Sequence, residues 1–386
     1  MKTIKTILSL IIVLPGLLVL SLFEAQAQDT DLYKDQNADQ YENKFSYNVL
    51  SELHYNNVVY DKNGSTEVGK FDLHELHFKA GYKVNKYLKF KTALEIEHAF
   101  DSYYNGGDVF FKQAYFDYHK SDRVGLKVGL VNLPVTGSKS KIYSGVEIAP
   151  VEKYLSYAWR ELGVVAYGDL TSKLSYQTSL TTGLEATEIS SKSGIYSARN
   201  NSLLSSINNL AAAAQVKYKL NYNFTLGTSA LFSGLQSNQE FGGSLEGAAY
   251  TLMEGFAAYK SGAITSRLVG VYSTIQESDK INQILGKHIG SSQYGSLIEV
   301  TYNFLYDPNT GSKTKHFIVY SRVEAYNTQL TTIGFEADPK YERFEYTLGV
   351  LYKPFKQIEF KTDYQWLNSS GKKNLGQLNL AVAYSF

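Results

Sequence analysis

The residues His74-Glu75-Leu76-His77 bring two imidazoles and a carboxylate close together in the sequence. A zinc hydrolase motif spaces its histidines four residues apart on a helix, so that both face one metal ion. Here the histidines are three residues apart, and the flanking residues alternate in polarity as a strand does. Residues 74 and 77 of a regular strand face opposite sides of its sheet. The sequence therefore predicts no metal site at this segment.

Ser138 and Lys141 have the serine–lysine spacing of certain acyl-transfer enzymes. They lie in a stretch rich in Ser and Lys, and the other motifs of that chemistry do not accompany them. We therefore expect a protein that is not an enzyme and that needs no cofactor or metal. A membrane-embedded hydrolase, pairing a serine with one of the seven histidines, is the alternative from a different functional class.

Clustered lysine and arginine side chains could bind phosphate or another anion, because an anion must exchange its hydration for cationic donors. The candidates for such a cluster are Lys139, Lys141, Lys153 and Arg160 in the connection 131–162, and Lys89, Lys91, Lys127 and Arg343 on polar strand faces. Glutamates in the same connection and acidic residues on the same faces offset the positive charge of these candidates. Lining a wet lumen is the simpler interpretation of each single charge.

Alternation of apolar and polar residues recurs from Phe45 to the end of the chain and predicts strands to position these side chains. We predict sixteen, at 45–60, 70–84, 87–100, 109–118, 123–130, 163–168, 173–182, 212–220, 224–233, 248–260, 263–275, 293–305, 316–325, 342–353, 357–366 and 376–386. The faces of 248–260 and 263–275 are ambiguous. Many strands have the length of about ten residues that a tilted membrane strand needs.

Short and long connections alternate along the chain, which is typical of the periplasmic turns and external loops of outer-membrane barrels. The 14% aromatic share supplies residues for girdles at two interfaces. The polar faces carry opposite charges, as a wet lumen does. The fold class is therefore an all-β transmembrane antiparallel β-barrel of about sixteen strands. The long connection 183–211 is expected to be an external loop, and its end could form a short helix or be disordered.

The N-terminus has the pattern of a secretory signal peptide. Lys2 and Lys5 precede an apolar run, and Ala25-Gln26-Ala27 resembles a cleavage site. We expect a signal peptide at 1–27, a periplasmic lead at 28–44 and the barrel at 45–386. The mature chain would be formally neutral, which gives no support for nucleic-acid binding. Export as a barrel predicts the outer membrane of a Gram-negative bacterium, with its lipid as a partner.

Phe386 ends the chain in register with Tyr384, Val382, Leu380 and Leu378. A terminal phenylalanine after alternating apolar residues resembles the signal that the outer-membrane barrel assembly machinery recognises. We expect that machinery to be a partner, and Phe386 to be the assembly signal.

Residues 111–118, 124–129 and Leu133-Pro134 resemble the strand–turn–strand of the phosphate-selective porin O and P family. Ala149-Pro150, Trp159 to Val164 and Gly168 resemble that family's next loop and returning strand. The resemblance implies a sixteen-stranded porin that forms a homotrimer. It also implies that the loop after the fifth strand, 131–162, folds into the lumen and narrows it.

The function that these patterns favour is passive diffusion of small hydrophilic solutes through an outer-membrane porin, with a preference for anions or phosphate as a finer expectation. The alternatives are the hydrolase and a structural or adhesive barrel with a plugged lumen. Sixteen strands enclose an aqueous channel, whereas eight are filled by side chains, which disfavours the plugged barrel.

Overall fold

The computed structural model describes residues 44–60, 70–97, 108–135, 159–199, 209–236, 245, 247–309, 315–370 and 372–385. The predicted signal peptide, residues 28–43 of the lead, and Phe386 lie outside them. The strands are β1 (Phe45–Tyr60), β2 (Lys70–Lys83), β3 (Leu88–Glu97), β4 (Asp108–Ser121), β5 (Val124–Asn132), β6 (Arg160–Asp169), β7 (Leu174–Thr182), β8 (Leu184–Glu185), β9 (Leu210–Lys219), β10 (Phe224–Gln236), β11 (Ala249–Ser261), β12 (Ile264–Gln276), β13 (Ser292–Asn303), β14 (His316–Thr331), β15 (Glu342–Phe355), β16 (Ile358–Ser369) and β17 (Lys372–Ser385). The helices are η2 (Ala186–Glu188), η3 (Tyr196–Ala198), α2 (Ser278–Leu285) and η4 (Pro339–Tyr341).

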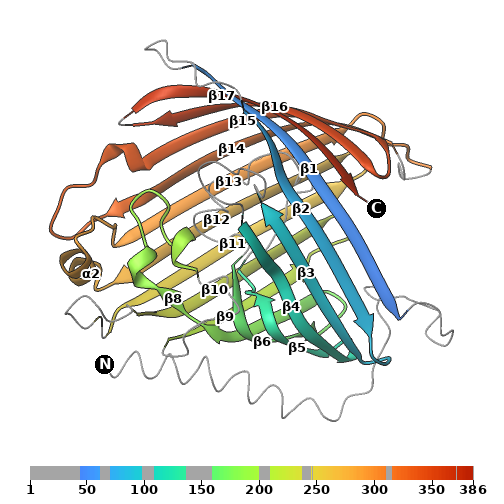
Figure 1. Cartoon of the computed structure of the whole chain (residues 1–386), viewed down its shortest axis with the longest axis horizontal. Helices are drawn as coiled ribbons and strands as arrows, with labels where there is room; N and C mark the ends of the chain where they lie inside the picture. The colour runs from blue at the N-terminus through green and yellow to red at the C-terminus, as the bar shows by residue number, and fades with distance from the viewer. Residues whose placement is uncertain are drawn as a thin grey trace.

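Sixteen strands form one closed antiparallel ring (Figure 1). Each pairs with its neighbour in sequence, β7 pairs with β9, and β17 pairs back to β1. The two-residue strand β8 is not part of the ring and pairs in parallel with β10. All sixteen predicted strands are confirmed, with shifted ends: β14, for example, continues to Thr331 rather than ending at 325.

The side chains alternate between the two faces of the wall. On β13, Leu297 and Glu299 face inward and are 1% and 3% exposed, whereas Ile298 and Val300 face outward and are 52% and 44% exposed. A closed ring pairs every strand edge, so an apolar outer face can contact lipid without exposing unpaired backbone groups. The chain is therefore an outer-membrane β-barrel.

Outward aromatic rings gather at the short-turn ends of β13, β14 and β15. Phe304 lies 4.8 Å from Tyr302 and 6.0 Å from Phe317, and Phe317 lies 6.3 Å from Tyr352, measured between ring centroids. Such rings form one of the two interfacial girdles of an outer-membrane barrel, and the end with short turns is the periplasmic one.

Side-chain oxygens build the short turns. The side-chain oxygen of Asn85 accepts from the backbone N–H groups of Tyr87 and Leu88, and that of Asn221 accepts from those of Asn223 and Phe224. Asparagine favours turns because it can hydrogen-bond to the backbone two residues later. These turns connect consecutive strands and fix their register.

A β-bulge in β2 changes which face of the sheet its histidines occupy. The β1–β2 register steps from Glu75 to Leu73, which leaves His74 as an extra residue. The His74 ring stacks on that of lumen-facing His54 with centroids 4.2 Å apart. The expectation that positions 74 and 77 face opposite sides is therefore wrong. A single inserted residue has reset the alternation, so both lie on the lumen side.

A second bulge lies in β4. The β3–β4 register steps from Gln113 to Phe111 and leaves Lys112 as the extra residue. Phe111 points outward, whereas the Lys112 ammonium reaches the side chains of His77 and Glu95 on the inner wall. Bulges re-aim individual side chains within a sheet, and here both add a nitrogen-bearing side chain to the same part of the lumen.

The helix α2 follows β12 at the loop-side end of the barrel (Figure 1). Ile281, Ile284 and Leu285 lie on one of its faces, and Ile281 is fully buried. Gly286 ends the helix with φ of 62°, a left-handed conformation that glycine adopts without strain. Among the described residues, no helix combines the length and the apolar character that crossing a membrane requires.

Candidate pore and its lining

A row of paired charges crosses the inner wall from β12 to β14. The Arg267 guanidinium donates to both carboxylate oxygens of Glu299, from Nε at 3.0 Å and from Nη2 at 3.3 Å. Arg322 lies 4.0 Å from Glu299 on the other side, and its Nε lies 3.0 Å from Oε2 of Glu324. All four side chains are at least nine-tenths buried. The signs alternate over Arg267, Glu299 and Arg322 on successive strands, and Glu324 follows on the same strand as Arg322, so every charge has an opposite neighbour. We call these four residues the charge belt.

Polar contacts continue around the wall onto β16 and β17. The Tyr320 hydroxyl donates to Oδ2 of Asp363 at 3.1 Å, and the Asn379 amide donates to Oδ1 of Asp363 at 2.7 Å. Lys361 lies 3.0 Å from Oε1 of Glu359. This part of the inner wall is polar and internally hydrogen-bonded, in contrast to the apolar outer face of the same strands.

The wall formed by β3 to β6 carries lysines next to aromatic rings and a carboxylate. Lys91 lies 3.6 Å from Oδ2 of Asp117, and the Tyr167 hydroxyl donates to Oδ1 of Asp117 at 2.5 Å. The Lys127 ammonium lies 4.8 Å from the centroid of the Tyr167 ring and 5.6 Å from that of Tyr115. These lysines are held by opposite charge and by cation–π contacts rather than forming a uniformly basic wall.

Residues 184–199, which we call the inward segment, fold against the inner wall instead of forming an external loop. Leu184, Ala186, Ile189, Ile195 and Ala198 are each at most 1% exposed. They belong to one apolar cluster with inward side chains of the wall, among them Leu231, Tyr250, Leu252, Val269 and Leu297. The expectation of an external loop over 183–211 is wrong for this part, because its apolar side chains find an apolar stretch of wall. Ala211–Ala214 lie in strand β9, not in a helix.

Hydrogen bonds hold the first part of the inward segment. The backbone N–H of Leu184 donates to Oγ of Ser233 at 3.0 Å. Lys287 donates to the carbonyl oxygens of Thr187 and Ile189, the latter at 2.7 Å. Burial lowers the pKa of Lys287. A lysine held this way stabilises the segment because it satisfies carbonyl groups that water no longer reaches.

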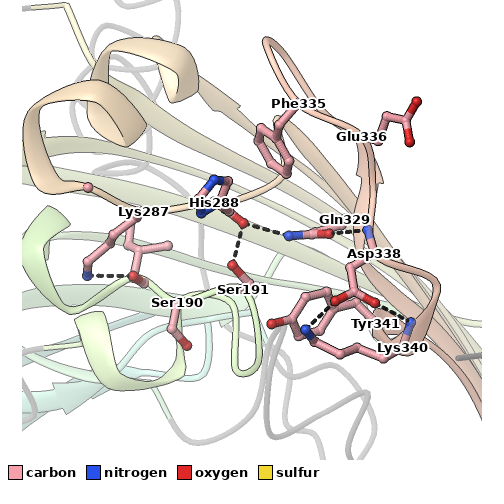
Figure 2. A pocket seen from close by; sticks show the side chains of 12 residues that line it. Ser190, Ser191, Lys287, His288, Gln329, Phe335, Glu336, Asp338, Lys340 and Tyr341 are labelled. Atoms are coloured by element: carbon pink, nitrogen blue, oxygen red, sulfur yellow. Dashed lines mark hydrogen bonds and ion pairs between the residues drawn. The ribbon is translucent and has the colours of Figure 1, made fainter. Parts of the chain in front are cut away.

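Further bonds fix the middle of the segment at the mouth of the barrel. The His288 carbonyl oxygen accepts from Oγ of Ser191 and from Nε2 of Gln329, the latter at 2.6 Å (Figure 2). Thr328 donates to the Ser191 carbonyl at 2.5 Å. Three parts of the chain, around residues 190, 288 and 329, thus form one connected structure at the loop-side end.

A pocket of about 510 Å³ opens beside these bonds. Figure 2 shows how the inward segment, the residues after α2 and the β14–β15 connection surround it. Its lining mixes rings with charged and amide groups: Ile189, Ser190, Ser191, Gly286, Lys287, His288, Gln329, Phe335, Glu336, Asp338, Lys340 and Tyr341. Lys340 pairs with Asp338, so this mouth pocket carries charges of both signs.

The two ends of the 131–162 connection are anchored inside the barrel. Trp159 donates from Nε1 to Oε1 of Glu161 at 2.9 Å, and Thr182 donates to Oε2 of Glu161 at 2.8 Å. The Arg199 guanidinium lies 5.6 Å from the Trp159 ring centroid. Burial lowers the pKa of Arg199 to about 10, so it remains a cation at neutral pH. At the other end Val135 is fully buried in the apolar cluster.

The predicted lining residues have different surroundings. Arg160 starts β6, is 9% exposed and lies 5.0 Å from the Phe110 ring centroid. Arg343 donates to the carbonyl oxygen of Lys192 at 3.3 Å, so it holds the inward segment. Lys89 is half-buried on the lumen face of β3, two residues before Lys91. Lys139, Lys141 and Lys153 lie outside the described residues.

Sequence reasoning missed both arginines of the charge belt and the inward segment. Arg267 lies in 263–275, a segment whose faces were ambiguous because apolar residues occupy both. Its partner Glu299 lies directly opposite it on the next strand. A better signal is the pairing of successive strands, since an inward arginine on one strand lies opposite an inward glutamate on the next.

No family model matches this chain. An uncharacterized protein of Aquifex aeolicus (strain VF5) is 28% identical over 354 residues, which cover 87% of this chain and 78% of that protein. Among solved structures, OprB of Pseudomonas putida aligns with a TM-score of 0.61 at 9% identity, covering 89% of this chain and 94% of that one. An anion-selective porin from Comamonas acidovorans aligns with a TM-score of 0.57 at 10% identity, over 89% and 99% of the two chains. The outer membrane channel DcaP of Acinetobacter baumannii gives 0.57 at 10% identity, over 89% and 97%. These similarities establish the fold of an outer-membrane porin barrel.

Proposed function

We propose that this protein is an outer-membrane porin through which small hydrophilic solutes diffuse passively. The observation that carries the proposal is the contrast between an apolar outer face and a polar, charge-paired inner wall on a closed ring of sixteen strands. A ring of that size encloses an aqueous channel. Fixed charges of both signs bind a passing solute weakly enough for it to leave again.

The inward segment narrows this channel from the side of β10 to β13, where it covers the apolar part of the wall. Water and solute then pass along the remaining wall, which carries the Asp363, Asn379 and Glu359 contacts and the lysines of β3 and β5. The inward segment is held by hydrogen bonds at several points, so it acts as a fixed constriction in this proposal.

The test is conductance in planar bilayers. Purified folded protein should insert in discrete steps, each giving an ohmic current at low voltage, and liposomes containing it should swell in small sugars. Protein denatured before addition serves as the control. Folded protein that inserts into liposomes and yet gives neither current nor swelling contradicts the proposal and favours the plugged barrel.

Ion preference is a separate part of the proposal. Lys91, Arg267, Arg322 and Lys361 each contact a carboxylate, so these four cations give the lumen little net positive field. We propose that any anion or phosphate preference comes from Lys139, Lys141 and Lys153. Replacing Lys139 and Lys141 with glutamate should shift the reversal potential toward cations. An unchanged reversal potential would show that these lysines do not lie at the constriction.

Assembly as a homotrimer is also part of the proposal, on the strength of the sequence resemblance. Native mass spectrometry of the detergent-extracted barrel should give three chains per particle. Particles of one chain at concentrations where porin trimers persist would contradict it.

A further inference from the structure

Four side chains meet on the lumen side of β2, β3 and β4, next to the two bulges. Nε2 of His77 lies 2.9 Å from Oε2 of Glu75 and 2.7 Å from Oε1 of Glu95. One ligand atom from each of these three residues lies within 4.8 Å of the other two. Lys112 contributes the fourth side chain from its bulge. The histidine and two glutamates therefore converge on a single point in the barrel wall.

This donor set has the chemistry of a transition-metal site. One imidazole nitrogen and two carboxylate oxygens are ligands that zinc accepts, and a catalytic or exchangeable zinc site often has three protein ligands. Calcium and magnesium prefer oxygen ligands alone, so the central imidazole favours a metal of the zinc type. His77 and Glu95 are 5% and 0% exposed, and a buried imidazole and carboxylate are poorly hydrated and gain by binding a cation.

The Lys112 ammonium already lies where a cation would bind. Its Nζ is 2.9 Å from Nε2 of His77 and 3.5 Å from Oε2 of Glu75, and it also contacts Glu95. Nε2 of His77 therefore lies between this ammonium and two carboxylate oxygens. A cation at the position of the ammonium faces a ligand atom of each of the three residues.

The hydrogen bonding within this cluster is incomplete. Nδ1 of His77 is buried and has no hydrogen-bond partner. Oε1 of Glu95 lies in close ion pairs with His77 and Lys112, and neither oxygen of Glu95 has a well-formed hydrogen bond. Buried polar atoms are nearly always hydrogen-bonded, and exceptions point to a redox, catalytic or ion-binding role. One ammonium also balances the charge of only one of the two glutamates. The cluster would accommodate a doubly charged ion better.

We propose that Glu75, His77 and Glu95 form a binding site for a divalent transition metal of the zinc type, and that the metal displaces the Lys112 ammonium. The Lys112 side chain is 30% exposed, whereas those of Glu75 and His77 are 14% and 7% exposed. Lysine has a long flexible stem, so its ammonium can move into lumen water while the three ligands stay in place. A bound metal cross-links β2 to β3 and neutralises the charge of both glutamates.

The test is titration of Zn²⁺ into the folded full-length barrel in detergent, followed by calorimetry. Wild type should bind one zinc ion at this site. Lys112→Met should bind it at least about tenfold more tightly, because a competing positive charge is removed. His77→Ala and Glu95→Gln should weaken binding by at least about tenfold, since each removes a ligand. His119→Ala is the matched control, because His119 lies 3.6 Å from Asp122 elsewhere on the barrel, and it should behave as wild type.

The change in gel mobility on heating, which folded barrels show, checks that each variant is folded. Lys112→Met keeps all three ligands, so it tests the site even where a ligand variant fails to fold. Two outcomes overturn the proposal: zinc binding that Lys112→Met does not tighten, or zinc binding that folded Glu95→Gln and His77→Ala retain in full. Neither outcome bears on conductance, so the diffusion proposal stands or falls separately.

Discussion

The Lys287 ammonium donates a 2.7 Å hydrogen bond to the carbonyl oxygen of Ile189, which lies 98 residues earlier in the chain. Lys287 also donates to the Thr187 carbonyl. One side chain that follows α2 therefore satisfies two backbone acceptors of the inward segment. This long-range contact, and not only the local sequence, holds the inward segment in place.

Replacing Lys287 with methionine should loosen the inward segment without unfolding the barrel. Hydrogen bonds to a charged donor contribute about 1.5–3 kcal/mol, so the segment should open at least about tenfold more often. Proteinase K should then cleave within 184–199 correspondingly faster. The control is Lys192→Met, which removes the same charge from an exposed side chain of the segment. Equal cleavage rates for wild type and Lys287→Met would show that the contact does not hold the segment.

Apolar packing of the inward segment should be separable from the stability of the ring. Ile195 is fully buried in the apolar cluster, and Ile195→Ala should cost about 2–5 kcal/mol of docking free energy. We expect the single-channel conductance to be larger and noisier. The temperature at which the heat-modifiable gel mobility is lost should stay the same, because the hydrogen bonds between the strands are untouched. Ile298→Ala, on the 52% exposed outer face, is the control and should leave conductance unchanged. A constant conductance in Ile195→Ala would mean that the segment does not narrow the pore.

The strands could be predicted because alternation is a local property. On β13, for instance, outward Ile298 and Val300 alternate with inward Glu299 and Thr301, and this polarity indicates the faces without knowledge of any partner. The closed ring then follows from the number of such strands and from the alternation of short and long connections. Strand ends were less accurate, since pairing extends β14 beyond the alternating residues.

The position of the inward segment and the cluster of Glu75, His77 and Glu95 could not be predicted, because both depend on contacts between residues that are distant in the sequence. Ile189 and Ile195 follow no helical or strand period, and their burial results from contact with an apolar wall that extends from Leu231 to Leu297. His74 illustrates a different limit. One bulge residue reverses the phase of a strand, and nothing in the alternation marks where it falls.

Orientation in the membrane is tested by two tags. A short epitope inserted at Gly334, an exposed turn between β14 and β15 with φ of 81°, should be labelled on intact cells. The same epitope at Asn221, in the short turn between β9 and β10, should be labelled after the outer membrane is permeabilised. Short turns are periplasmic in outer-membrane barrels. Labelling of the Asn221 tag on intact cells, with the Gly334 tag hidden, would reverse the assigned orientation.

Removing one sign from the charge belt should unbalance its paired charges and shift the ion preference of the pore, in opposite directions for the two signs. Arg267→Met removes a positive charge beside Glu299, so the reversal potential in a KCl gradient should shift toward cations. Glu299→Gln should shift it toward anions, and the double variant should return close to wild type, because its net charge equals that of wild type. Charges inside a low-dielectric wall are felt strongly because the field is focused in the lumen.

Lys356→Met is the matched control for this series. Lys356 is exposed in the periplasmic turn between β15 and β16, where salt screens its charge over about 10 Å at 0.1 M. The same loss of one positive charge should therefore change the reversal potential little. If Lys356→Met and Arg267→Met shift it equally, net charge rather than position governs selectivity. The position of the charge belt in the pore would then have no particular effect on ion selectivity.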